Sequence, residues 1–506
     1  MDSKKRIAVN TLAQYAKTII SGIITLYSSR VILKSLGVDD FGIYSLIAGI
    51  IMMLSFLTNA LSSTTQRYIS YYQGKGIQRE VSMYFCNSIF IHIFLGLILS
   101  LIFLAITPIL THYLNIPQGR MDAAIQVYYA VILTLFFALV TSPFRAVLIS
   151  HENIIYISIM DVVDVILKLL IALSLSTIGF DKLLYYGWML MLIQVFNFVV
   201  FSIYSFLKYC ECIIPKIKYI ELSKIKELLM FAGWNVYSLG CTLGRTQGIS
   251  VALNIFVGTV ANAAYGLGIQ LSSYVNYMSE SLLNAMRPQI MKAEGNNERG
   301  RMLLLSGRAS KYSFFLLSLV SIPCIFEMPM LLHLWLGEYP DYGILFARMF
   351  MLAGIVDSLS IGLHVANQAT GNLKQFSLII NTMKFATLPF AVISLYLSKN
   401  VWIVALLYIV IELFAAMMRI KVLSKDGLNI STYIRSVLIR CFVPFVIYSL
   451  ICYLIISFND GIHVLIAMFT IIPILYLFLI YYLGLETSER ESLKQMCFSV
   501  FRNVKN

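Results

Sequence analysis

The amino-acid sequence predicts an all-α polytopic membrane protein with about fourteen transmembrane helices. Hydrophobic residues make up 59% of its 506 residues and charged residues only 12%, about half the charged fraction of a typical soluble domain. Apolar stretches of about 20 residues, long enough to cross a bilayer as a helix, recur from one end of the chain to the other. Basic residues are distributed unevenly among the segments that join these stretches, as expected for a membrane protein with a fixed orientation.

Hydropathy places the predicted spans. They are residues 8–33, 41–63, 82–111, 124–147, 154–177, 183–207, 229–256, 262–285, 312–335, 342–366, 375–397, 400–418, 436–457 and 462–484. Lys4, Lys5 and Arg6 precede a long first span without a small-residue cleavage site. We therefore expect this span to be retained, since a cleaved signal peptide would be shorter and would carry such a site.

The basic residues orient the spans. With the N-terminus inside, and with Arg145 at the end of span 124–147 assigned to the inner segment 145–153, 27 of the 38 Lys and Arg residues fall in inner segments, four in outer loops and seven within spans. Because positively charged loops stay on the cytoplasmic side, we expect both termini in the cytoplasm. That the membrane is a bacterial inner membrane is an expectation that rests on the family resemblance given below. The basic excess is then topological, and we expect no nucleic-acid partner.

An internal repeat divides the chain. At a constant offset of 221 residues, Gly37 aligns with Gly258 and Tyr44 with Tyr265. Six spans separate the two copies, so both enter the membrane in the same direction, as parallel repeats. This predicts an N-lobe of six helices and a C-lobe of six helices, followed by two extra C-terminal helices. The predicted boundaries are 1–210 for the N-lobe, 211–228 for a cytoplasmic linker, 229–424 for the C-lobe and 425–506 for the last two helices and a cytoplasmic tail.

Four basic residues lie near the middle of predicted spans, namely Lys17, Arg245, Lys168 and Lys384. A charged side chain at the bilayer centre costs about 3 kcal/mol on insertion scales, so it indicates water, a partner or a substrate. We predict that these four residues form a cationic substrate-binding cavity. A cavity of this charge favours an anionic headgroup, such as a diphosphate or an acidic sugar, over a cationic drug.

Polar residues with helical spacing accompany these charges. One face of the first span and one face of span 229–256 each carry such a stripe, and a third polar side chain shares the face of Lys384. We predict that these side chains line a hydrated cleft between two lobes: Gln14, Ser21, Asn235, Ser238, Thr242 and Asn381. The alternative is helix–helix hydrogen bonding, which explains Ser and Thr well but explains Lys17 and Arg245 poorly.

Four carboxylates within spans are candidates for ion coupling to a proton or sodium counter-ion. Asp164 can pair with Lys168, four residues further along the same helix. Asp161, which has no such partner, is the better candidate on this face. Asp357 and Glu412 are further candidates, and pairing with a nearby base is the alternative for each.

A function of a different class, that of a membrane glycosyltransferase, has one feature in its favour. Asp39 and Asp40 lie in the first outer loop, where such enzymes can place catalytic acids. Helix capping before Phe41 is the interpretation that we favour. The outer loops are short, and no phosphate loop, zinc motif or nucleophile elbow stands out. We therefore expect no enzymatic activity, no cofactor and no metal.

Three segments carry a family resemblance. They are residues 30–46 (RVILKSLGVDDFGIYSL), Thr65-Gln66-Arg67-Tyr68 followed by Gly74-Lys75-Gly76, and Arg287-Pro288-Gln289-Ile290 followed by Glu294-Gly295-Asn296. These segments resemble the signature of spans 1–2 and the inner loops of the polysaccharide and O-antigen flippases. That family belongs to the multidrug/oligosaccharidyl-lipid/polysaccharide exporter superfamily.

The resemblance implies a fold and a function. The fold would be two six-helix bundles that rock about a central cavity. The function would be alternating-access translocation of a polyprenyl-diphosphate-linked oligosaccharide, such as an O-antigen, capsule or exopolysaccharide repeat unit, from the inner to the outer leaflet. The implied partners are this lipid-linked oligosaccharide, membrane lipids and the polysaccharide-assembly machinery. A peptidoglycan-precursor flippase and a multidrug/cation antiporter of the same fold stay open as alternatives.

Overall fold

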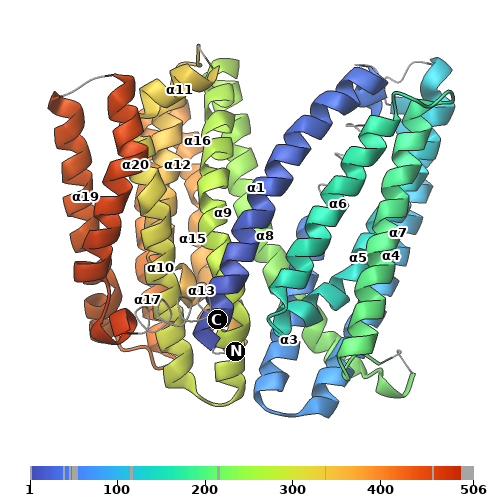
Figure 1. Cartoon of the computed structure of the whole chain (residues 1–506), viewed down its shortest axis with the longest axis horizontal. Helices are drawn as coiled ribbons and strands as arrows, with labels where there is room; N and C mark the ends of the chain where they lie inside the picture. The colour runs from blue at the N-terminus through green and yellow to red at the C-terminus, as the bar shows by residue number, and fades with distance from the viewer. Residues whose placement is uncertain are drawn as a thin grey trace, which may run out of the picture. The chain divides into compact units, whose positions relative to one another are not determined.

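The computed structural model describes residues 3–37, 40–44, 47, 55–113, 118–213, 217–336, 338–458 and 461–491, and these contain helices and turns without β-strands (Figure 1). In chain order the longer helices are α1 (Ser3–Leu36), α3 (Ser55–Gly74), α4 (Gln78–Tyr113), α5 (Met121–Ser150), α6 (Ile154–Ser174), α7 (Lys182–Lys208), α8 (Leu222–Phe256), α9 (Thr259–Gly295), α10 (Arg299–Phe326), α11 (Met328–Leu336), α12 (Gly343–Ser358), α13 (Ile361–Thr370), α16 (Thr387–Ser398), α17 (Val401–Ser424), α19 (Ile439–Phe458) and α20 (Ile462–Leu479). Short helical pieces complete them: α14 (Leu373–Phe376), α15 (Thr382–Phe385) and α18 (Ile430–Tyr433), with one-turn segments η1 (Gln118–Arg120) and η2 (Ile217–Tyr219).

The predicted fold class is confirmed, because the chain is an all-α polytopic membrane protein. Within the described ranges, nine helices are individually long and apolar enough to cross a membrane, and α12 and α13 together meet the same test across a 47° bend. The helices α6, α8 and α9 overlap three further predicted spans. Part of the span predicted at 41–63 lies outside the described residues.

The chain divides into two compact units. The first, here called the N-terminal unit, comprises residues 6–236 with 295–297, and the second, the C-terminal unit, comprises 1–5, 237–294 and 298–506. The division falls within α8, between Val236 and Tyr237. The predicted domain boundaries stay predictions.

The N-terminal unit is built around α5, which packs against α3, α4 and α7. The core where these helices meet is apolar and includes Phe85, Phe144, Leu148 and Phe201. These side chains fill the spaces between helices, because in a lipid environment association depends on van der Waals packing and on polar contacts between helices. The helices α1 and α6, which carry the first charged cluster described below, belong to the same unit.

The C-terminal unit is built around α10, which packs against α12, α13, α19 and α20. In Figure 1 the last two of these, drawn in red, run side by side at the edge of the unit. A buried ion pair between Lys311 of α10 and Glu489, with Nζ and Oε2 2.6 Å apart, fixes the chain that follows α20 to α10. Deeper in the unit, Tyr265, Phe346, Phe350 and Tyr408 form one apolar cluster that joins α9, α12 and α17.

Three π-helical segments interrupt the helices of the C-terminal unit. They are η3 (Ser377–Asn381), η4 (Ile434–Leu438) and η5 (Ile480–Gly484). A single π turn inside an α-helix is rare, and it occurs frequently at functional sites. The segment η3 lies between α14 and α15, just before Lys384.

A buried carboxylate joins three segments at one end of the N-terminal unit. Glu211, in the loop that follows α7, pairs with His151 Nε2 and accepts hydrogen bonds from Gln73 Nε2 at 3.2 Å and Gln78 Nε2 at 3.1 Å. Burial alone would raise the pKa of Glu211, but the hydrogen bond and charge of His151 outweigh it and lower this pKa to about 2. The loop therefore depends on an ionised Glu211.

We expect acid to loosen this end of the protein. A carboxyl group with a pKa of about 2 when folded and about 4.5 when unfolded stabilises the fold fully above pH 4.5, and this contribution is lost as the pH falls towards 2. Thermal unfolding of the purified protein between pH 6 and pH 3 should show a steeper acid loss in the parent than in Glu211→Gln. The same acid dependence in both proteins would show that Glu211 does not carry it.

Candidate functional site

Five charged side chains form a continuous chain of ion pairs inside the C-terminal unit. They come from four helices: Arg245 from α8, Asp357 from α12, Lys384 from α15, and Glu412 and Arg419 from α17. We call this set the ion chain.

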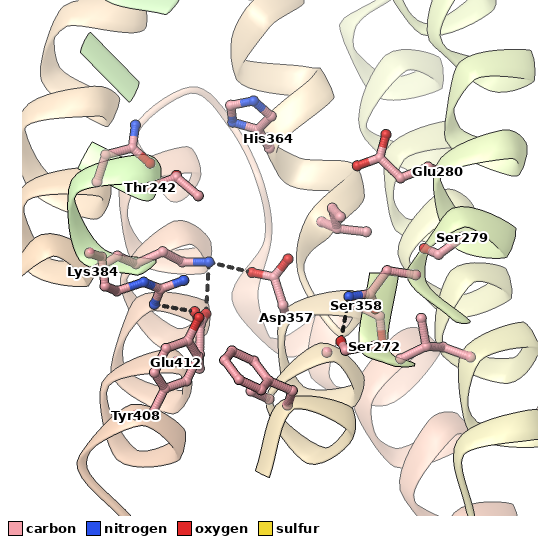
Figure 2. A pocket seen from close by; sticks show the side chains of 18 of the residues that line it. Thr242, Ser272, Ser279, Glu280, Asp357, Ser358, His364, Lys384, Tyr408 and Glu412 are labelled. Atoms are coloured by element: carbon pink, nitrogen blue, oxygen red, sulfur yellow. Dashed lines mark hydrogen bonds and ion pairs between the residues drawn. The ribbon is translucent and has the colours of Figure 1, made fainter. Parts of the chain in front are cut away.

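The ion chain alternates in sign from one residue to the next. Arg245 Nη1 donates to Glu412 Oε1 at 2.7 Å, and Lys384 Nζ lies 2.7 Å from Glu412 Oε2. Lys384 Nζ also lies 2.6 Å from Asp357 Oδ1, which Arg419 Nη1 approaches to 2.8 Å. Figure 2 shows Lys384 between the two carboxylates.

Burial makes these pairs mutually dependent. The side chains of Arg245 and Glu412 are only 6% and 3% exposed. The Arg245 guanidinium also lies 4.3 Å from the centroid of the Tyr408 ring, a distance typical of a cation–π contact. Charges so far from water persist only when they are paired with good geometry, so the five residues are expected to act as one unit.

The ion chain borders a cavity of about 350 Å³ within the C-terminal unit. The opposite wall comes from one face of α9, which presents Ser272, Asn276, Ser279 and Glu280. In Figure 2, Lys384, Glu412 and Tyr408 lie on one side, Ser279 and Glu280 on the other, and Asp357 between them. The cavity therefore offers hydroxyl, amide and charged groups among otherwise apolar helices.

The segment η3 supplies part of this lining through hydrogen bonds to α8. Asn381 Nδ2 donates to Ser238 Oγ at 2.6 Å, and Ser238 Oγ lies 3.0 Å from Ser377 Oγ. Both η3 residues thus meet one serine of α8. The contact holds the Lys384 helix against the Arg245 helix, so it contributes to placing the two bases on Glu412.

A second charged cluster lies inside the N-terminal unit. Lys17 Nζ of α1 is 2.7 Å from Asp161 Oδ2 of α6. Arg145 of α5 donates two hydrogen bonds to the same carboxylate, from Nη1 to Oδ1 at 2.9 Å and from Nη2 to Oδ2 at 3.2 Å. Two bases therefore share one acid.

The structure corrects the prediction that Asp161 lacks a partner, because Lys17 and Arg145 both pair with it. The predicted pair of Asp164 and Lys168 is confirmed, with Oδ2 and Nζ 2.7 Å apart. Asp164 also accepts a hydrogen bond from Asn197 Nδ2 at 2.7 Å. The coupling roles of these carboxylates stay predictions.

Half of the predicted site residues meet at the cavity of the C-terminal unit, and half do not. Those that line it are Ser238, Thr242, Arg245, Asp357, Asn381, Lys384 and Glu412. Those that belong to the N-terminal unit are Gln14, Lys17, Ser21, Asp161, Asp164, Lys168 and Asn235. The predicted binding and coupling roles of both groups stay predictions.

The lining of this cavity differs in two respects from the cleft predicted between the two lobes, and that cleft stays a prediction. Asn235 does not line this cavity, because its buried amide donates to Ser63 Oγ at 3.4 Å and Thr64 Oγ1 at 3.2 Å. The cavity is also not dominated by bases. Three carboxylates balance the three basic side chains of the ion chain, since Glu280 joins Asp357 and Glu412 in the lining.

Sequence reasoning missed two arginines, Arg145 and Arg419. Both were counted with inner segments, yet α5 continues to Ser150 and α17 to Ser424, so both are helical. Arg419 follows Glu412 by seven residues, which places the two on one helix face. That spacing is the signal that could have identified Arg419. No comparable signal links Arg145 to Asp161 on another helix.

Asp40, one of the two acids interpreted as a helix cap before Phe41, is paired with Arg120. Arg120 Nε donates to Asp40 Oδ1 at 2.8 Å, and Arg120 Nη1 lies 2.5 Å from Asp181 Oδ2. Burial raises the pKa of Asp181, but the hydrogen bonds from Arg120 and from the backbone at the start of α7 lower it overall. Asp40 therefore joins an ion cluster with Arg120 of η1 and with Asp181 at the start of α7, and Asp39 lies outside the described residues.

The chain is similar in sequence to one protein family and to a membrane protein of Bacillus subtilis. Residues 3–293 match the polysaccharide biosynthesis protein family. The chain is 22% identical over 360 residues to the uncharacterized membrane protein EpsK of Bacillus subtilis, with 69% of this chain and 68% of EpsK aligned.

Solved structures agree on the fold. A MOP superfamily transporter from Pyrococcus furiosus superposes with a TM-score of 0.72 at 13% identity, covering 86% of this chain and 97% of that one. A multidrug resistance MATE family transporter in an outward-facing conformation gives a TM-score of 0.72 at 14% identity, covering 86% and 98%. The chain therefore belongs to the polysaccharide biosynthesis protein family, and its fold is that of these MOP superfamily transporters.

Proposed function

We propose that this protein is a flippase that moves a polyprenyl-diphosphate-linked oligosaccharide from the inner to the outer leaflet of a bacterial inner membrane. The substrate would carry the repeat unit of an O-antigen, capsule or exopolysaccharide. Its lipid tail stays in the bilayer while its headgroup crosses through the protein by alternating access. In this orientation both termini are cytoplasmic.

The polar cavity in the C-terminal unit is the observation that carries this proposal. Moving sugar hydroxyls or charges through hydrocarbon without hydrogen-bond partners costs several kcal/mol per group. A cavity of about 350 Å³ lined by serines, amides and ion pairs supplies such partners inside the membrane. Its volume lies in the range of small-molecule sites, about 300–1,000 Å³. Membership of a polysaccharide biosynthesis family favours a glycan over other polar cargo.

The membrane potential can drive this movement. An inside-negative potential contributes about 2.3 kcal/mol per charge per 100 mV, so a diphosphate with about two negative charges gains several kcal/mol on moving outward. Proton or sodium entry at Asp161, Asp164, Asp357 or Glu412 would add to this drive. Each of these carboxylates is ion-paired, so a coupling ion would have to compete with a basic side chain for it.

Deletion of the gene tests the proposal. Cells without the protein should lose surface polysaccharide and accumulate the lipid-linked repeat unit in the inner leaflet, and expression of the parental protein should restore both. Lipid-linked repeat units can be extracted and quantified, and their accessibility to a periplasmic glycosidase reports the leaflet.

Two other outcomes would each assign a different cargo. Normal surface polysaccharide with increased sensitivity to cationic drugs would contradict the proposal and favour a multidrug exporter. The carboxylates of the cavity lining, Glu280, Asp357 and Glu412, would suit a cationic drug. Accumulation of the peptidoglycan precursor with cell lysis would favour a precursor flippase.

A further inference from the structure

A second cavity, of about 360 Å³, lies in the C-terminal unit, and it shares no lining residue with the cavity that the ion chain borders. Its walls come from the first part of α10, the loop between α17 and α18, the segment η4 and the chain that follows η5. We call it the η4 cavity. Its volume lies near the lower end of the range for small-molecule sites, about 300–1,000 Å³, so it suits a small headgroup better than an oligosaccharide.

Two of the three π-helical segments described above border the η4 cavity. Ser436 and Val437 of η4 lie in its wall, and η5 ends at Gly484, two residues before the lining residue Glu486. Such turns occur frequently at functional sites, and the third one, η3, lies just before Lys384 of the ion chain. The segments η4 and η5 therefore mark a cavity to which the proposed transport path gives no role.

One part of the cavity wall is a buried ion pair that is already satisfied. Lys311 Nζ lies 2.6 Å from Glu489 Oε2, and both side chains are only 2% exposed. Tyr312 Oη donates to Glu489 Oε1 at 2.9 Å, and the backbone nitrogen of Glu486 donates to Oε2 at 2.8 Å. Because Lys311 and Glu489 neutralise each other, they give the wall a fixed shape without leaving a net charge for a ligand.

Two further charged side chains of the wall keep most of their hydrogen-bonding capacity. Within the described part of the chain, Arg308 has one ion pair, a 3.4 Å contact from Nε to Glu489 Oε1, and its side chain is 23% exposed. The Glu486 carboxylate, 34% exposed, has one ionic partner among the same residues, Arg440 Nε at 3.9 Å. That distance is too long for a hydrogen bond. The cavity therefore presents one guanidinium and one carboxylate that a ligand can reach.

These two charges select a ligand that carries one negative and one positive group. A guanidinium binds phosphate oxygens through parallel donors, and a carboxylate accepts hydrogen bonds from a primary ammonium. A purely anionic headgroup would place a like charge beside Glu486. A quaternary ammonium has no N–H to donate, and it is typically bound in a cage of several aromatic rings. Tyr433 supplies the one aromatic ring that the described residues place in this wall.

Apolar residues of the wall favour a lipid over a free, water-soluble ligand. Four aliphatic side chains share the wall with the charged groups, namely Leu303, Leu304, Leu428 and Val437. Leu304 is 50% exposed, and Ile434 of η4, next to the lining residues of that segment, is 41% exposed. An acyl chain attached to a bound headgroup therefore has apolar surface on which to lie.

The charged groups lie where phospholipid headgroups are expected. The predicted span 312–335 begins one residue after Lys311, and Arg308 lies about one turn earlier on α10. Basic side chains near the ends of spans extend their charged tips to the interface. In the proposed orientation this end of α10 faces the cytoplasm, so these headgroups are those of the inner leaflet.

We propose that the η4 cavity binds the phosphoethanolamine headgroup of an inner-leaflet phospholipid, with its phosphate on Arg308 and its ammonium on Glu486. The bound lipid joins α10 to the chain that follows η5, so it stabilises the C-terminal unit. The site does not depend on the cargo proposed above, and only its assignment to the inner leaflet rests on the proposed orientation.

Native mass spectrometry of the delipidated, full-length protein in detergent tests the site. Dioleoyl phosphatidylethanolamine, phosphatidylglycerol and phosphatidylcholine are added in equal amounts, and the lipid retained by the protein is counted. The parent should retain phosphatidylethanolamine as a single adduct, more than about threefold over either other lipid, because only this headgroup satisfies both charges. Phosphatidylethanolamine should also raise the temperature of thermal unfolding more than the others do, since it binds the folded protein best.

Three variants separate the two halves of the headgroup. Arg308→Gln should weaken retention of phosphatidylethanolamine about tenfold, because it removes charge-assisted hydrogen bonds to the phosphate. Glu486→Gln should abolish the preference for phosphatidylethanolamine over phosphatidylglycerol, because it removes the acceptor for the ammonium. Glu486→Lys should reverse that preference, because the wall then carries two cations. A reversed preference is a gain that loss of the fold cannot produce.

The chain offers a matched control for each charge. Arg301 lies on the same helix as Arg308, is 57% exposed and is not part of the wall, so Arg301→Gln should keep the parental preference. Glu491, exposed and also outside the wall, gives the same comparison for Glu486 through Glu491→Gln. Thermal unfolding of each variant identifies any protein that has lost its fold.

Equal retention of the three lipids by the parent, or an unaltered preference in folded Glu486→Gln, would overturn this inference. Stabilisation by soluble phosphoethanolamine equal to that by the lipid would overturn the lipid source and assign the site to the free compound. The gene-deletion experiment is independent of these results. The expected lipid preference with normal surface polysaccharide after deletion would overturn the proposed function alone, whereas lost export without any lipid preference would overturn this inference alone.

Discussion

Glu412→Gln is expected to destabilise the protein by about 3–5 kcal/mol, the range measured when one partner of a buried ion pair is removed. Glu412 holds Arg245 through one oxygen and Lys384 through the other. A neutral amide leaves both bases without their shared anion, and it presents an NH₂ group to one of them. Denaturant titration of the purified protein measures the loss, and glycan export should fall with it.

The chain offers a matched control in the same unit. Glu298 pairs with Arg301 across three residues of an exposed helix turn. Exposed pairs contribute about 1 kcal/mol or less, so Glu298→Gln should be nearly neutral. Combining Arg245→Gln with Glu412→Gln should recover part of the loss, since neither charge is then left unpaired. A Glu412→Gln protein as stable as Glu298→Gln would show that the ion chain is not a stabilising unit.

Gly362→Ala is expected to be the most disruptive conservative change in the C-terminal unit. A Cβ at this position of α13 would lie 2.0 Å from the backbone oxygen of Ser306 and 2.9 Å from the backbone nitrogen of Ser310. Both contacts are with backbone of α10, which cannot move aside as a flexible side chain could. The methyl group would therefore separate α13 from α10 and break the 3.0 Å hydrogen bond from Gly362 N to Ser310 Oγ. Overpacking of this kind costs about 1–3 kcal/mol or more.

Gly300→Ala is the control for the same chemical change. Gly300 lies in the first turn of α10, and a Cβ there would meet no atom within 4 Å. Alanine favours the helix by up to about 1 kcal/mol over glycine, so this variant should be unchanged or slightly more stable. The two variants can be compared by the temperature at which each aggregates from detergent. Equal behaviour would contradict the close approach of α13 to α10.

Hydropathy predicted where the long apolar helices lie but not where they end. The span predicted at 262–285 lies within α9, which continues to Gly295, and the span at 312–335 begins well inside α10, which starts at Arg299. A hydropathy window detects only the apolar part of a helix, whereas the backbone hydrogen bonds continue into polar turns. The bend between α12 and α13 was also missed, because residues 359–360 contain neither proline nor glycine.

The candidate site was partly predictable for a related reason. The cost of a charge in hydrocarbon drew attention to Lys17, Arg245 and Lys384, and the structure places all three in charged clusters. Spacing within one helix identified the pair of Asp164 and Lys168. Spacing says nothing about partners on different helices, so the partners of Asp161, 144 and 16 residues away in the chain, could not be predicted.

The π turn of η3 sets the direction in which Lys384 leaves its helix. A π turn holds about one residue more than an α turn, and one residue corresponds to about 100° of rotation around the helix axis. Without that additional residue, everything after Asn381 would be rotated by roughly this angle, and the Lys384 ammonium would leave the carboxylates of Asp357 and Glu412. The lysine's role is thus encoded by the number of residues before it as well as by its own identity. A relative aligned with a one-residue gap between 377 and 384 could keep every side chain of the ion chain and still lack the junction that Lys384 makes.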